Sequence, residues 1–174
     1  MHQTLYISHP SYLDHETPLG HPERPDRLRA IDRALEDERF MGLDRESAPW
    51  GTIEQVELAH PLPYITGIRD ACPDEGLVRI DADTTVSPGT WEAAMRGVGA
   101  ACQAVDEVVT RKAKNAFCAS RPPGHHAERA TSMGFCFFNN AAIAARHAQK
   151  EHGIDRVAVV DFDVHHGNGT QDIL

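Results

Sequence analysis

Short apolar runs and amphipathic stretches alternate along the chain, and this alternation predicts strands and helices in turn. Residues 4–8 (TLYIS) are a predicted strand, and residues 116–120 (AFCAS) are a second one that we expect to be buried. Residues 156–163 (RVAVVDFD) form an almost continuous β-branched run, which is typical of a strand buried in a parallel sheet. These strands lie far apart in sequence, so other elements must connect them.

Apolar residues at helical spacing fill the gaps between these strands. Pro25 is expected to open a helix that runs to about Phe40. Ser87 and Pro88 give a cap and a first turn for a long helix that ends near Val109. The apolar face of this long helix is formed by Trp91, Met95, Val98, Cys102, Val105 and Val109.

A further helix is expected with Asn139 or Asn140 as its cap and Gly153 as its stop. Residues 44–90 are rich in turn residues, and only short helices near 53–59 and 61–71 are expected there. Strand, crossover helix and strand form a βαβ unit, so the chain is predicted to be α/β with a parallel sheet. A new helix begins in the final GTQDIL, so the chain resembles a domain cut in two.

The composition is that of an ordinary globular domain, with 41% hydrophobic and 25% charged residues among 174. No apolar run approaches the roughly 20 residues of a membrane span, and no secretory signal is visible, so we expect a cytoplasmic location. The net charge of −9 argues against nucleic-acid binding. The four cysteines form no C-x-x-C pair and are expected to be reduced, buried thiols. The unusual feature is the eleven histidines, several of which cluster.

The first histidine cluster is RPPGHH, residues 121–126, which directly follows a predicted strand. Loops beyond the carboxyl ends of parallel strands are where α/β sheets bind ligands. Two prolines and a glycine restrict this loop, and the unperturbed pKa of histidine suits proton transfer near neutral pH. A single histidine is usually a solvated or structural residue, but a doublet in such a loop favours a functional site.

The second cluster, DFDVHHGNG, spans residues 161–169 at the end of the next predicted strand. Residues two apart in an extended backbone point to the same side, so Asp161, Asp163 and His165 are expected to converge. A carboxylate and an imidazole supply two of the three protein ligands that a catalytic zinc usually takes. The alternative, a polar cap on a buried strand, does not explain so many polar side chains in one segment.

Four separated motifs together resemble the histone deacetylase family. They are GHPERPDRL (20–28), RPPGHHA (121–127), GFCFFNN (134–140) and VDFDVHHGNG (160–169), in the family's order and at about its spacing. The resemblance implies a three-layer α/β/α fold with a mostly parallel sheet, which arginase shares. It covers nearly all of this chain but only about half of a family domain, so residues 1–174 are expected to be the N-terminal half of one catalytic domain.

The resemblance implies the ligands of a zinc ion and the chemistry beside it. Asp163 and His165 would bind Zn²⁺. His126 would be the general base that activates the metal-bound water and later protonates the leaving amine, with electrostatic support from His125. Backbone carbonyls at residues 161, 163 and 165 resemble part of a structural K⁺ site found in the family.

The resemblance also implies the partners of the two catalytic histidines. Asp161 would accept a hydrogen bond from His125 and fix its tautomer. Asn168 stands where the class I branch has an aspartate, so it partners the second histidine and matches the class II branch. These two polar residues complete the expected catalytic group.

The substrate implied by the resemblance is an acetylated lysine peptide or an acetylated small amine. Gly134 and Phe135 would line the narrow channel that takes its extended chain. Arg24 is expected near the pocket where acetate leaves, and Asp83 near the substrate backbone. The third zinc ligand and an oxyanion-binding tyrosine lie in the family's second half, so the isolated chain is expected to be inactive or nearly so.

Alternatives remain at this point. An arginase-like two-manganese site needs a D-x-H-x-D run, which this sequence lacks. A family member that acts on acetylpolyamines or in acetoin utilisation is harder to separate from one that acts on histones, because the sequence does not identify most residues at the channel rim. A non-catalytic binding or assembly module of the same fold is the alternative from another class. Because half a sheet exposes a strand edge, we also expect self-association.

Overall fold

The computed structural model describes residues 3–174 and contains a small parallel sheet between helices. The sheet has the strand order β2-β1-β5, formed by Thr4–Ser8 (β1), Asp44–Ser47 (β2) and Asn115–Cys118 (β5). Leu5 lies opposite Asp44 on one side and Ala116 on the other, so β1 is the central strand. The predicted strands at 4–8 and 116–120 are confirmed, although β5 is only half-buried because its outer edge is unpaired among the described residues.

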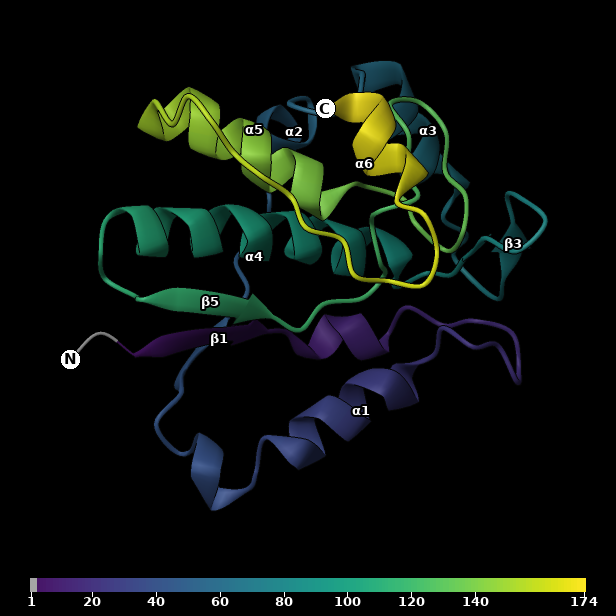
Figure 1. Ribbon diagram of the computed structural model, residues 1–174. Coiled ribbons are helices and arrows are strands. Elements are labelled where there is room, and N and C mark those ends of the chain that lie inside the picture. Colours follow the sequence, from purple (N-terminus) through teal and green to yellow (C-terminus); the bar gives the residue numbers. More distant parts are fainter. Residues whose placement is uncertain (1–2) are drawn as a thin grey trace.

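Helices cover both faces of this sheet, which gives three layers (Figure 1). Pro25–Ala34 (α1) lies on one face, and the long helix Thr90–Val109 (α4) lies on the other. Asn140–His152 (α5) packs along α4 as an outer helix. The remaining helices are Ile53–Val56 (α2), Leu62–Ala71 (α3) and Asn168–Ile173 (α6), with 3-10 turns at Pro10–Leu13 (η1) and Glu38–Phe40 (η2).

Most predicted helices are confirmed, with differences at their ends. Asn139 accepts a hydrogen bond from Ala142 N as the cap of α5, and Gly153 ends that helix in the left-handed conformation. Helix α1 stops before residue 40, and the η2 turn follows after a break. The cap of α4 is Gly89 rather than Ser87, because Thr90 Oγ1 accepts a hydrogen bond from Ser87 N and closes a turn before the helix.

The prediction of a strand at 156–163 is wrong for this chain. These residues form no helix or strand, and most are exposed, with Val160 at 83% and Phe162 at 97%. A strand rich in Val on both sides needs a paired neighbour and a covering layer on each face. Among the described residues no element supplies the outer layer, so the run stays unpaired beside β5. Its apolar side chains face solvent.

Two buried clusters hold the layers together. One lies between β1, α1 and α4 and includes Leu5, Ile7, Tyr12 and Leu28. The other joins α3, α4 and α5 to the loop that carries Phe137 and Phe138, both almost fully buried. An antiparallel pair, Val78–Arg79 (β3) and Thr85–Val86 (β4), borders the second cluster. Within residues 3–174, no helix is both long and apolar enough to cross a membrane.

Candidate active site

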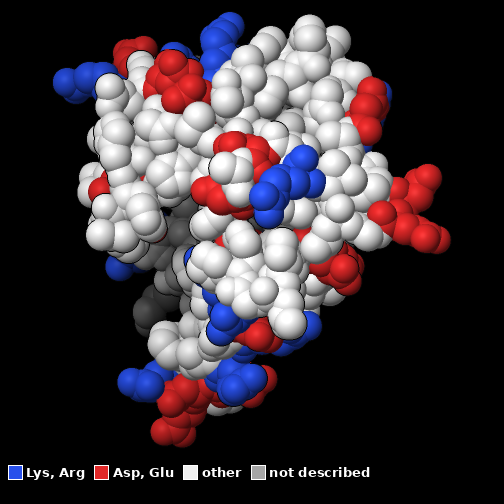
Figure 2. Space-filling model, turned by 90° about the vertical axis from the view of Figure 1, so that its right-hand side faces the viewer, with Lys and Arg blue, Asp and Glu red and all other residues white. Residues whose placement is uncertain are grey.

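A cavity of about 510 Å³ opens at the end of the sheet toward which β1 and β5 run. Loops that follow these two strands form most of its wall, as expected for a ligand site of a parallel sheet. Figure 2 looks onto this end of the molecule, where acidic and basic side chains are interspersed over a largely uncharged surface. The cavity is lined by Pro22, Glu23, Arg27, Asp83, Pro123, His125, His126, Gly134, Phe135, Asp163 and His165.

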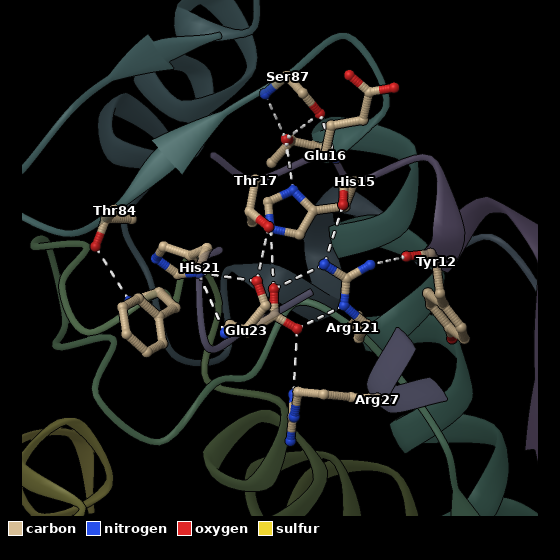
Figure 3. A network of polar contacts seen from close by, with 12 residues as sticks. Tyr12, His15, Glu16, Thr17, His21, Glu23, Arg27, Thr84, Ser87 and Arg121 are labelled. Atoms are coloured by element: carbon tan, nitrogen blue, oxygen red, sulfur yellow. Dashed lines mark hydrogen bonds and ion pairs between the residues drawn. The ribbon is translucent and has the colours of Figure 1, made fainter. Parts of the chain in front are cut away.

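The loop after β5 is fixed to the core by Arg121, whose side chain is fully buried (Figure 3). Its guanidinium forms a two-pronged ion pair with Glu23, with Nη2 2.8 Å from Oε2. It also donates to the carbonyl oxygens of Tyr12 at 2.6 Å and His15 at 3.0 Å. Each of the three guanidinium nitrogens therefore has at least one acceptor, and the buried charge has a carboxylate as its counter-charge.

Glu23 is the opposite charge in this network and is only 3% exposed. Burial alone would raise the pKa of its carboxyl, but the hydrogen bond and charge of Arg121 outweigh burial and lower that pKa. His15 lies 3.6 Å from Glu23 and contacts Thr90 Oγ1 at 2.8 Å. Burial lowers the pKa of His15 to about 4, so this ring is neutral at neutral pH.

His125 and His126 lie side by side in the cavity wall, with ring centroids 4.1 Å apart. Nδ1 of His125 is 2.8 Å from Asp161 Oδ2, and Nδ1 of His126 is 2.6 Å from Asn168 Oδ1. Asn168 Nδ2 donates to Glu128 Oε1, so its carbonyl oxygen must face His126. Both histidines therefore carry their proton on Nδ1, which leaves each Nε2 free to accept a proton.

Asp163 and His165 are brought together on the same wall, although no strand carries them. Asp163 Oδ1 accepts from His165 N at 2.7 Å and lies 2.9 Å from His165 Nδ1. Asp161 Oδ1 accepts from Asp163 N in the same way, so backbone turns produce the convergence that we predicted from an extended strand. The side chains of Asp163 and His165 are 49% and 70% exposed.

This pair fits two positions of a zinc site, because its oxygen and nitrogen donors already face each other. In residues 3–174 no third His, Cys, Asp or Glu lies close enough to complete the group. Asp163 has a lowered pKa because His165 N donates to it, so its carboxylate form is favoured. The expected K⁺ site stays a prediction.

Gly134 and Phe135 line the cavity beside His126, and both have positive φ values, 55° and 70°. A Cβ on Gly134 would lie 2.4 Å from His126 Cδ2, so this glycine allows the ring of His126 to pack against the backbone. Phe135 N donates to Thr84 Oγ1, which holds the turn. Asp83 lines the same cavity, and its contact with a substrate stays a prediction.

Arg24 does not line the cavity. It is half-exposed, and its Nε lies 3.6 Å from Asp26. Arg27 lines the cavity instead and donates from Nη1 to Glu23 Oε1 at 3.1 Å. Arg24 is the N-cap of α1 and has an extended backbone, whereas Arg27 lies in the first turn of the helix, so the two side chains leave the chain in different directions.

Glu23, Arg27 and Glu128 are members of the site that the sequence did not reveal. Glu23 and Arg27 are four residues apart at the start of α1, a spacing that brings opposite charges together on a helix. That spacing is the signal which could have identified Arg27. Glu128 orients Asn168 from 40 residues away, and no local pattern indicates such a contact.

Comparisons with known proteins match this geometry to one family. Residues 21–174 match the profile of the histone deacetylase domain. The chain is 41% identical to the histone deacetylase-like amidohydrolase of Pseudomonas aeruginosa over 155 residues, which cover 88% of this chain and 40% of that protein. It is also 41% identical over 158 residues to the human polyamine deacetylase HDAC10, covering 86% of this chain and 23% of the human protein.

A solved structure agrees with the fold. The crystal structure of the HDA15 HD domain superposes with a TM-score of 0.93 at 34% identity, and it covers 99% of this chain and 50% of that one. The predicted α/β fold, three layers around a mostly parallel sheet, is thereby confirmed, with only part of it in this chain. The chain spans about half or less of the length of these relatives.

Proposed function

The chain belongs to the histone deacetylase family, and on that premise we propose that it supplies the histidine dyad and two metal ligands of a zinc-dependent amide hydrolase. The bond cleaved is the amide of an acetylated lysine or a related acetylated amine. The observation that carries this proposal is the pair His125 and His126, each with Nδ1 held by a fixed acceptor and Nε2 free, in one cavity with Asp163 and His165.

His126 acts as the proton carrier in this proposal. Its Nε2 takes the proton of the attacking water and later delivers it to the nitrogen of the leaving amine. The hydrogen bond to Asn168 keeps the tautomer that this transfer needs. His125, paired with the carboxylate of Asp161, stabilises charge beside it.

Asp163 and His165 would hold the zinc ion through a carboxylate oxygen and an imidazole nitrogen. When bound, zinc polarises an amide carbonyl and lowers the pKa of a coordinated water toward about 7. Two protein ligands hold zinc weakly compared with three. We therefore propose that residues 1–174 are the N-terminal half of one catalytic domain, and that they hydrolyse amides poorly or not at all without the other half.

The substrate is proposed to enter as an extended acyl-amine chain through the cavity that Gly134, Phe135 and the dyad line together. The rim of the cavity carries Asp83, an acceptor for backbone or amine N–H groups. Acetylated lysine and acetylated polyamine present the same amide at the end of an alkyl chain, and the human relative is named for polyamines. Asn168 supports placing the chain in the class II branch, because that branch has an amide at this position.

The test measures hydrolysis of acetyl-lysine peptides and acetylpolyamines by the 174-residue chain and by a form extended through the second half of the domain. We expect activity from the extended form only, and we expect a chelator to remove it. His126→Ala in the extended form should abolish turnover, while Arg24→Ala, outside the cavity, should leave most of it. Silence of the extended form with both substrates would favour a non-catalytic binding module.

A further inference from the structure

A second cluster of metal-binding side chains lies away from the active site, between α4 and α5. It consists of Asp106 in the last turn of α4 and His147 and His152 at the end of α5. None of the three lines the active-site cavity. We propose that this cluster binds one divalent ion of the late first transition series, with Zn²⁺ as the reference ion.

The donor atoms already converge on one point. Nε2 of His147 and Nε2 of His152 each lie 2.7 Å from the same oxygen of Asp106, Oδ1. The three donor atoms lie within 4.8 Å of one another. Ligands at about 2.0–2.1 Å from a tetrahedral ion are separated by roughly 3.3 Å, so an ion between them needs shifts of less than about 1 Å.

The surroundings allow these shifts. Nδ1 of His147 is buried and has no hydrogen-bond partner among the described residues, so no bond behind the ring resists its movement. The side chain of Asp106 is 44% exposed, which gives an ion a path of entry and leaves room for water as a further ligand. The cluster therefore has a buried side, provided by His147, and an open side, provided by Asp106.

The electrostatic environment favours a cation. The carboxyl ends of α4 and α5 meet at this cluster, and both helices run toward the same end of the molecule (Figure 1). Unpaired carbonyl groups at helix carboxyl ends carry partial negative charge. The cavity beside the cluster also contains Glu54 and Glu151, with Lys150 as its one basic side chain.

The donor set selects the class of ion. Two imidazoles and one carboxylate suit Zn²⁺, Co²⁺, Ni²⁺ or Cu²⁺, whereas Mg²⁺ and Ca²⁺ prefer oxygen ligands. A bound ion would join two helices that otherwise meet through side-chain packing and the hydrogen bonds of Asp106 with His147 and His152.

The test uses the complete chain with Asp163→Ala and His165→Ala, so that the active-site ligands do not contribute. Co²⁺ is titrated while its visible d–d absorption is recorded, and Zn²⁺ is then added as a competitor. We expect one Co²⁺ per chain, displaced by Zn²⁺. Adding Asp106→Asn or His152→Gln should weaken binding at least tenfold, whereas Lys150→Gln, which removes a positive charge from the same cavity, should not weaken it.

Thermal unfolding distinguishes a metal site from a cluster that only forms hydrogen bonds between α4 and α5. Zn²⁺ should raise the Tm of the parent variant in a concentration-dependent way and should not raise that of the Asp106→Asn form. Equal Co²⁺ binding by the parent and Asp106→Asn would overturn the proposal, and so would the absence of binding to the parent. Near-ultraviolet thiolate-to-cobalt absorption would overturn it as well, because the ligands would then be cysteines.

Discussion

The two sides of the active-site cavity are held in very different ways. On one side, Arg121 and Glu23 are almost fully buried and fix the loop that carries the dyad. On the other side, Asp163 and His165 are largely exposed and lie on a segment with no strand pairing. The chain thus positions His125 and His126 by itself, whereas Asp163 and His165, the proposed metal ligands, lack a supporting layer. Pre-organisation of catalytic groups depends on such support.

The largest effect on stability is expected when one charge is removed from the buried pair of Glu23 and Arg121. Glu23→Gln leaves the Arg121 guanidinium buried without a counter-charge, and breaking such a pair costs about 3–5 kcal/mol. Urea denaturation should show this loss of unfolding free energy. Asp70→Asn, which removes the exposed partner of Arg69, is the matched control and should change little. Equal losses in both variants would contradict a special role for the buried pair.

A second test displaces His126 by enlarging Gly134, which packs against its ring. Gly134→Ala places a Cβ against His126 and also forces alanine into a positive φ. The combined cost is about 2–4 kcal/mol, from backbone strain and overpacking. Gly153→Ala has the same kind of φ but open space around the Cβ, so it should cost only about 1–2 kcal/mol. If urea denaturation shows no difference between them, His126 is not packed as described.

The buried side should also make stability depend on pH. The pKa of His15 is about 4 in the folded chain and near 6.5 when unfolded, so the unfolded state binds the extra proton between these values. Stability should therefore fall as pH is lowered through that window, by about 2 kcal/mol at pH 5 for this residue.

The measurement for this third test is the urea midpoint at pH 7 and at pH 5. His15→Gln should reduce the difference between the two midpoints. His60 is buried with its pKa also lowered to about 4, so His60→Gln should reduce the difference by a similar amount. An unchanged pH dependence in both variants would rule out these rings as its source.

The smallest effect on stability is expected on the exposed side. Val160→Ser and Phe162→Ser remove side chains that are 83% and 97% exposed, so the unfolding free energy should change by less than about 0.5 kcal/mol. The same changes should reduce the expected self-association of the chain, which sedimentation velocity measures. Phe137→Ser, in the core, should instead cost several kcal/mol, about 3–5. Loss of stability in the surface variants would mean that this segment is packed after all.

Elements with strong local signals were predictable from sequence. Asn139 and Gly153 mark the two ends of α5 because capping depends on residues next to the helix. Strand β2, with the sequence DRES, has no apolar pattern and exists because its backbone pairs with β1. The run at 156–163 is the opposite case. Its sequence has a strong strand pattern, but no strand forms because residues 3–174 do not provide the neighbours that it needs.

The candidate site divides in the same way. The motifs indicated His125, His126 and their region, and the structure places Asp161 and Asn168 beside them. The buried pair of Glu23 and Arg121 joins residues 98 positions apart, and no periodicity reports such a contact. The difference between Arg24 and Arg27 depends on the direction in which α1 leaves the loop. Tertiary geometry settles that direction, and local sequence does not.

The central position of β1 has a consequence for how the chain folds. Strand β1 is synthesised long before β5, with which it pairs, and Ser8 Oγ donates to Ala119 O across 111 residues. At typical translation rates, β1 is made on the order of ten seconds before its partner. Contacts of such large sequence separation also slow folding in general. Of the two strands that pair with β1 in the described residues, only β2 has been made during this interval, so the other edge of β1 is open to non-native pairing.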